Sequence, residues 1–223
     1  MITFKQYLSE KEETLADVIQ EFCGPYLKES ERNGVLLRGI TNIGAPHGEA
    51  NVDGRKTPYW IKKVRKDRAP KSTPPDVQVV LDEWFEAKFG WKARAEGMFC
   101  VGYPGQNTAQ QYGDSLCLVF PMNEFKYVWS EETEDLWDNI LDVAMDTPGG
   151  FYEMENNIVI KKDGKRIVKR DLLHKYLDKL DYRNDGLDEA VESNKEIMVG
   201  CDYYIAVRHE EGWYDLAKQL RLV

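Results

Sequence analysis

Two charged residues stand where apolar strands are expected, and they are the first candidates for chemistry. Glu196 precedes the apolar run 197–199, and Arg38 lies inside the apolar run 35–40. A carboxylate held by a strand in a site of low dielectric stabilises positive charge that develops on a substrate. A guanidinium pairs with phosphate or carboxylate through parallel hydrogen bonds. Because a buried arginine is costly without an anionic partner, Arg38 predicts a bound anion or an internal carboxylate.

Two structural interpretations compete with a catalytic one. Glu196 could simply solvate the end of a strand, as most exposed glutamates do. Alternatively, Arg38 and Glu196 could form a buried pair in an α+β protein without a site at this place. An open cleft near Tyr112 that Arg38 and Glu196 both face, with no salt bridge filling it, is the observation that would distinguish a site from either interpretation.

The elements that must position these residues follow from hydrophobic periodicity and from turn residues. The sequence predicts strands at 35–40, 97–102, 116–121, 196–199 and 203–207, helices at 75–90, 107–113, 129–146, 171–180 and 212–220, and a hairpin over 158–169. Strands and helices that alternate irregularly in this way predict an α+β domain over residues 32–223. Residues 1–31 are strongly charged and have apolar residues at helical spacing, which predicts an N-terminal helical arm or leader.

The composition excludes several classes of protein. The chain has 223 residues, 42% of them hydrophobic, and its apolar runs are far shorter than the roughly 20 residues of a membrane helix. This predicts a protein of the cytoplasm without a membrane partner. The four cysteines form no CxxC pair and the three histidines are dispersed, so we expect buried thiols and no metal site.

The net charge of −9 is unevenly distributed. Residues 55–71 contain eight Lys and Arg against one Asp, within a segment 42–75 that has no core pattern and is expected to be a long loop. Such a cluster is either a local phosphate-binding surface or a solvated loop. Arg65 and Arg68 are its candidates for phosphate contacts.

Taken together, three pieces of this chain resemble the ADP-ribosyltransferase superfamily. They are the strand that ends in Leu37-Arg38-Gly39, the strand and short helix from Phe99 to Tyr112-Gly113, and the strand that opens with Asn194-Lys195-Glu196. Members of this family present an Arg or His, then a Ser/Thr or Tyr motif, then a Glu on successive strands of a split β-sandwich around NAD. The resemblance covers most of residues 35–208 and therefore implies that fold, with flanking helices and the N-terminal helical appendage.

The resemblance also implies roles for individual residues. Arg38 would hold NAD, and Gly39 would let the backbone approach the nicotinamide amide. Phe99 and Tyr112 would be the aromatic residues of the middle motif, with Tyr112 stacked on the nicotinamide ring. Glu196 would bond the nicotinamide ribose and stabilise the oxocarbenium-like centre. NAD is the expected cofactor, and the expected acceptor is a host protein or nucleic acid.

The chain departs from the family pattern at two positions. Cys100-Val101-Gly102 stand where the middle motif often reads Ser-Thr-Ser, so the usual serine support of Glu196 is missing. Asn194 stands where transferases that modify arginine often have a second glutamate. These departures leave an alternative open: a non-catalytic protein on the same scaffold that binds a host protein or nucleic acid through residues 55–71.

The first ten residues carry a second resemblance. Met1-Ile2-Thr3-Phe4-Lys5-Gln6-Tyr7-Leu8-Ser9-Glu10 looks like the short leader of internal head proteins in T4-like phages, in which a hydrophobic-x-Glu site is cut; Leu8-Ser9-Glu10 fits that site. This resemblance implies a protein that is packaged in a phage head and delivered to the host cytoplasm.

Overall fold

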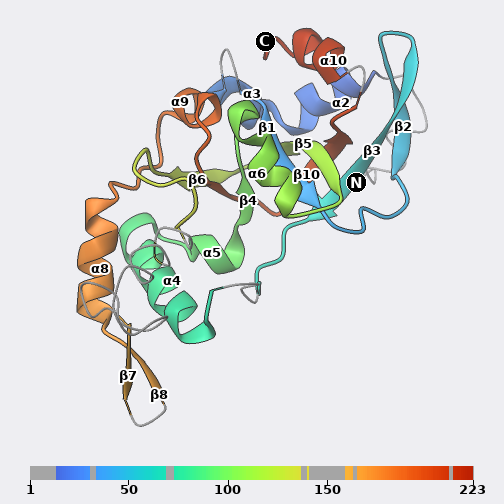
Figure 1. Cartoon of the computed structure of the whole chain (residues 1–223). Coiled ribbons are helices and arrows are strands. Elements are labelled where there is room, and N and C mark those ends of the chain that lie inside the picture. The colour runs from blue at the N-terminus through green and yellow to red at the C-terminus, as the bar shows by residue number, and fades with distance from the viewer. Residues whose placement is uncertain are drawn as a thin grey trace, which may run out of the picture.

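The computed structural model describes residues 14–30, 34–68, 73–136, 140, 159–162, 165–210 and 213–222. Over these ranges the chain combines antiparallel sheets with helices (Figure 1), so the α+β prediction is confirmed at this level. The expected leader at residues 1–10 lies outside the described residues. In the part of the chain that is described, no helix is long and apolar enough to cross a membrane.

The larger sheet has five antiparallel strands in the order β1-β5-β10-β3-β2. Its strands are β1 (Leu36–Ile40), β2 (Gly48–Val52), β3 (Arg55–Lys63), β5 (Ser115–Pro121) and β10 (Tyr203–Arg208). The predicted strands at 35–40, 116–121 and 203–207 are therefore confirmed. β5 and β10 lie inside the sheet because most of their side chains are apolar on both faces and buried.

The smaller sheet has three antiparallel strands in the order β4-β9-β6. They are β4 (Met98–Cys100), β9 (Ile197–Gly200) and β6 (Lys126–Trp129). The chain changes from one sheet to the other on both sides of β4, between β5 and β6, and again between β9 and β10. Leu37 and Val101 also exchange two backbone hydrogen bonds of 2.8 and 3.0 Å, so β1 is tied directly to the end of β4. The two sheets are thus joined near Arg38.

The helices gather in two groups around these sheets. They are α2 (Leu15–Phe22), α3 (Gly24–Glu29), α4 (Pro75–Phe89), α5 (Ala93–Glu96), the 3-10 turn η1 (Tyr103–Gly105), α6 (Gln106–Gln111), α8 (Arg170–Lys179), α9 (Leu187–Glu192) and α10 (Trp213–Gln219). Figure 1 shows α4, α5 and α8 at one end of the molecule, and α2, α3 and α10 at the other. The predicted hairpin is present as β7 (Val159–Lys162) and β8 (Lys165–Val168).

The buried side chains form two hydrophobic clusters. The larger cluster contains side chains of both sheets, α2 and α10, among them Phe120, Ile205 and Leu216. The second cluster joins α4 and α8 to one face of the smaller sheet through Val128 and Met198. Because side chains alternate along a strand, Ile197 and Val199 point to the first cluster while Met198 between them points to the second.

The described helices of the N-terminal segment pack into the larger cluster. Thr14 caps α2 with a capping box to Asp17, and Leu15, Ile19 and Tyr26 are fully buried. Residues 15–29 therefore dock on the rest of the domain. A domain boundary between residues 31 and 32 stays a prediction.

The expected long loop over 42–75 is wrong for residues 48–63, which form the β2–β3 hairpin. Its turn has positive φ at Asp53 (49°) and Gly54 (79°), and the Asn51 side chain accepts a 2.7 Å hydrogen bond from the Gly54 N–H. Asp-Gly at such a turn is a recognised hairpin signal. More than half of the basic segment 55–71 is therefore a strand rather than a loop.

The predicted acidic helix at 129–146 is wrong at its start. Trp129 is the last residue of β6, and the hydroxyl of Ser130 bonds to the Leu180 carbonyl instead of capping a helix there. The segment 131–135 is a turn. Residues 137–139 and 141–146 of the predicted helix lie outside the described residues.

Candidate functional site

Glu196 lies directly before β9 and is only 4% exposed. Strand alternation places its side chain on the same face of the smaller sheet as Met198, which pairs with Phe99 on one side and Val128 on the other. This is the face on which α4 and α8 pack. The interpretation of Glu196 as a solvated strand end is therefore wrong, because helices cover it.

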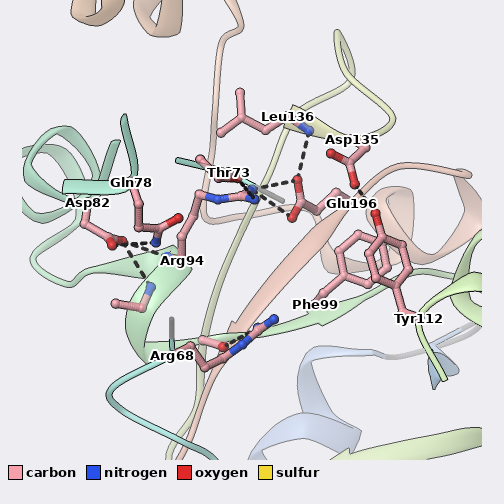
Figure 2. A network of polar contacts seen from close by, with 12 residues as sticks. Arg68, Thr73, Gln78, Asp82, Arg94, Phe99, Tyr112, Asp135, Leu136 and Glu196 are labelled. Atoms are coloured by element: carbon pink, nitrogen blue, oxygen red, sulfur yellow. Dashed lines mark hydrogen bonds and ion pairs between the residues drawn. The ribbon is translucent and has the colours of Figure 1, made fainter. Parts of the chain in front are cut away.

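Arg94 of α5 is the ion-pair partner of Glu196. Its Nη1 lies 3.2 Å from Oε1 and 3.4 Å from Oε2 of the carboxylate, and the backbone N–H of Leu136 donates to Oε2 at 3.1 Å (Figure 2). The other guanidinium nitrogen, Nη2, donates to the Thr73 hydroxyl at 3.4 Å. The carboxylate thus accepts three hydrogen bonds, which compensate for its removal from water.

Asp82 of α4 positions Arg94. The carboxylate Oδ1 accepts the backbone N–H groups of Arg94 at 3.0 Å and Ala95 at 3.2 Å, and Oδ2 accepts the Gln78 side chain at 2.7 Å. The N-cap of α5, Lys92, makes no side-chain capping bond of its own. Asp82 therefore satisfies the free N–H groups at the start of α5 from a neighbouring helix.

Burial shifts the pKa values of these carboxyl groups. It raises the pKa of Glu196 above its ordinary value, with a further contribution from Asp135, while Arg94 and the Leu136 N–H oppose the shift. Burial likewise raises the pKa of Asp82, and its hydrogen bonds oppose that shift. In both carboxyl groups, specific hydrogen-bond donors oppose the effect of surroundings that disfavour charge.

An aromatic pair adjoins the carboxylates. The rings of Phe99 and Tyr112 have centroids 4.5 Å apart and are tilted by 35°, and the Tyr112 hydroxyl donates a 2.6 Å hydrogen bond to Asp135. Asp135 directly precedes Leu136, whose N–H binds Glu196. Figure 2 shows Tyr112, Asp135 and Glu196 next to one another. Tyr112 is 39% exposed, so its ring is accessible from solvent.

Arg38 reaches the same group of residues from β1. Its Nη1 donates a 2.7 Å hydrogen bond to the carbonyl of Phe99. Arg68 binds nearby, through Nη1 to the Gly97 carbonyl at 3.0 Å and through its backbone N–H to the Ala95 carbonyl at 3.2 Å. Burial lowers the pKa of Arg68 to about 10, and the positive charges of Arg38 and Arg94 contribute. Three guanidinium groups therefore lie close to one another here.

Close packing against α6 explains why residue 39 is a glycine. A Cβ at this position would lie 2.1 Å from the Ala109 carbonyl oxygen and 2.7 Å from the Gly113 nitrogen. The backbone of β1 is thus in direct contact with α6 and the residues that follow it. This contact occupies the side of Gly39 on which a side chain would stand.

The structure brings together most of the residues that the sequence singled out. The contacts above connect Arg38, Arg68, Phe99, Tyr112 and Glu196. The expected buried pair of Arg38 with Glu196 is wrong, because Glu196 pairs with Arg94 and Arg38 binds the Phe99 carbonyl. Arg65 is exposed and pairs with Asp67 at 3.6 Å, without a contact to this group.

Sequence reasoning missed Arg94, Asp82 and Asp135. Asp82 had a detectable signal, because it lies four residues after Gln78 on a helix whose neighbouring positions are apolar. Arg94 lies in a short segment of alternating small and charged residues, which gives no periodic signal. Asp135 lies within the acidic helix that the sequence predicts over residues 129–146.

No family model, curated protein or solved structure matches the chain. The residues themselves must therefore carry the functional argument. Among the described residues, no group of three or more His, Cys, Asp and Glu side chains is placed to hold a metal ion.

Proposed function

We propose that this chain is an NAD-dependent ADP-ribosyltransferase with a split β-sandwich of that family's type, acting on a host protein or nucleic acid. The observation that carries the proposal is a continuous series of contacts. It runs from Arg38 to the Phe99 carbonyl, from the Phe99 ring to Tyr112, from Tyr112 to Asp135, and from the adjoining Leu136 to Glu196. The three residues expected to act together are thus gathered at the place where the two sheets join.

The chemistry of each group fits one part of NAD. Arg38 and Arg68 supply positive charge for the diphosphate, since guanidinium groups suit phosphate oxygens. The accessible ring of Tyr112 offers a stacking surface for nicotinamide. Glu196 supplies negative charge beside the ribose carbon. In the reaction the bond from that carbon to nicotinamide breaks, nicotinamide leaves with the electron pair, and an acceptor nucleophile bonds to the carbon and releases a proton.

Arg94 and the Leu136 N–H hold the Glu196 carboxylate in place, as the Ser-Thr-Ser motif does in members of the family. An ionised carboxylate has about four acceptor sites, and Glu196 uses three of them on these donors. The fourth acceptor site is not used by these donors, and because Glu196 is only 4% exposed, a ribose hydroxyl reaches it only when the residues that cover it move. Because Arg94 is itself fixed by Asp82 and Thr73, the carboxylate is oriented before a ligand binds.

The decisive experiment measures release of nicotinamide from NAD, together with NAD binding by calorimetry, in the presence of a host lysate. Glu196→Gln keeps the shape of the side chain and should abolish release while NAD still binds. Tyr112→Ala should weaken NAD binding, whereas Tyr112→Phe should retain most of it. Glu124→Gln, an exposed glutamate in the turn before β6, is the matched control. Absence of both NAD binding and nicotinamide release in the unmodified protein would refute the proposal.

The Arg94–Glu196 ion pair also favours a second candidate, a non-catalytic binding protein on the same scaffold. A glutamate that is buried and already paired can serve structure alone. Binding to a host protein or nucleic acid would then use residues 55–71. Lys63 and Arg65 are exposed, whereas Arg68 supports the loop around Gly97. Charge reversal at Lys63 and Arg65 should remove such binding, and Glu196→Gln should leave it intact.

A further inference from the structure

A pocket with a volume of about 120 Å³ lies between the β2–β3 hairpin, the end of β10 and α10. Its floor is formed by Val52, Val207 and Leu216, each no more than 3% exposed. A single water molecule needs only about 10–15 Å³ of such a cavity, so this pocket admits a larger chemical group. It shares no residue with the group around Glu196.

The rim of this pocket is positively charged. Arg55, Lys56 and Arg208 line it, against one carboxylate, Glu210, which lies 3.5 Å from Arg208. Arg55 and Lys56 are exposed, and within the described part of the chain neither has an ion-pair partner. In a protein with a net charge of −9, a rim with two excess positive charges is a local reversal of sign. Such a rim favours an anionic ligand.

An aromatic surface borders the same pocket. Trp213 forms part of the wall, and its ring stacks on His209 with centroids 4.9 Å apart and on Tyr103 with centroids 5.3 Å apart. The ring planes deviate by only 28° and 26°, and Tyr103 is 45% exposed. Stacked aromatic side chains beside cationic residues are suited to nucleobases, because every base has a π-face.

We propose that this pocket binds a nucleoside phosphate. Arg55, which shares a face of the sheet with Val52 and Val207, contacts the phosphate, and Lys56 and Arg208 add positive charge at the rim. The base lies against the surface of Trp213 and Tyr103. Arginine suits this role because its guanidinium matches phosphate geometry. A free mononucleotide and the phosphorylated end of a nucleic-acid strand present the same group. The proposal does not rest on ADP-ribosyl transfer, since the pocket is built from other strands and a different helix.

The test measures binding to the full chain by calorimetry at low and at moderate salt. The probes are AMP, adenosine, inorganic phosphate, and a short single-stranded oligonucleotide with and without a 5′-phosphate. The variants are Arg55→Gln, Lys56→Gln and Arg208→Gln, with Lys175→Gln, an exposed lysine of α8 outside the pocket, as the control. Arg38→Gln separates this pocket from the site near Glu196. Thermal unfolding shows which variants are folded, and the exposed positions 55 and 56 are expected to tolerate substitution.

We expect AMP or the 5′-phosphorylated strand to bind at least tenfold more weakly to Arg55→Gln than to Lys175→Gln, with smaller losses for Lys56→Gln and Arg208→Gln, and we expect binding to weaken with salt. Tighter binding of AMP would identify a free nucleotide as the ligand, and tighter binding of the phosphorylated strand would identify a strand end. The proposal is overturned if neither binds, if adenosine or inorganic phosphate binds as tightly as AMP, or if Arg38→Gln rather than Arg55→Gln removes binding. Nicotinamide release by Arg55→Gln is measured in parallel, so the two proposals can fail separately.

Discussion

Arg94 and Glu196, which are 102 residues apart in the sequence, form an ion pair between α5 and the start of β9. The pair joins the helical end of the molecule to the smaller sheet, beside the aromatic ring of Tyr112. Both side chains are largely buried, with 15% and 4% of their surface exposed. The strength and the ionisation of this ion pair can therefore be measured through the free energy of unfolding of the whole protein.

Removal of one partner should be strongly destabilising. Glu196→Ala leaves the Arg94 guanidinium buried without a counter-charge, which typically costs about 3–5 kcal/mol of unfolding free energy. Urea denaturation measures this loss, with Glu124→Gln as the exposed control. In a double-mutant cycle with Arg94→Met, the second substitution should recover part of the loss. A loss of unfolding free energy no larger than that of Glu124→Gln would contradict a structural role for the ion pair.

The raised pKa of Glu196 predicts a pH dependence of stability. Above the ordinary glutamate value of 4.5, the unfolded chain loses this proton before the folded chain does. The contribution of Glu196 to stability is therefore complete below pH 4.5 and is lost as the pH rises through its folded pKa. The free energy of unfolding of the unmodified protein, relative to that of Glu196→Gln, should fall with pH in this window. A difference that rises with pH would show that Arg94 depresses the pKa.

Asp82 should contribute to stability through α5. In Asp82→Ala the N–H groups of Arg94 and Ala95 lose their acceptor, at about 1–3 kcal/mol for each group that stays unsatisfied. Asp82→Asn retains an acceptor oxygen and should cost less. Hydrogen exchange of these two amides, measured with urea denaturation, should show faster exchange in the alanine variant only. Unchanged exchange in both variants would mean that water replaces Asp82 as the cap.

Gly39→Ala should be destabilising because of the contact between β1 and α6. The added Cβ meets two backbone atoms, the Ala109 oxygen and the Gly113 nitrogen, and neither can move without the chain. Overpacking of this kind typically costs about 1–3 kcal/mol. Gly24→Ala is the control, since a Cβ there has no atom within 4 Å. Equal melting temperatures for the two variants would argue against close packing at Gly39.

The sequence by itself determined the local elements. Periodicity identified the strands 35–40, 116–121 and 203–207, the helix that ends at Gly90, and the hairpin of β7 and β8, because each pattern depends on residues a few positions apart. The hairpin of β2 and β3 also has a local signal, the turn residues Asp53-Gly54. The charged residues around this turn form no core pattern, so the sequence predicts a loop there instead. The helix predicted from Trp129 failed because the acidic residues after it resemble an exposed helix, whereas Trp129 and Ser130 are buried.

Only the tertiary structure decided the partners of the charged residues. Sequence order gathered Arg38, Tyr112 and Glu196 as one set, but the counter-charge of Glu196 is Arg94, which no local pattern marks. The ion pair depends on Asp82, which fixes the start of α5, and on the pairing of β9 with β4 and β6 in the smaller sheet. Such contacts join residues about a hundred positions apart, and their energies depend on burial and exact orientation. Hydrophobic spacing determines which elements form, whereas packing of those elements determines which charges meet.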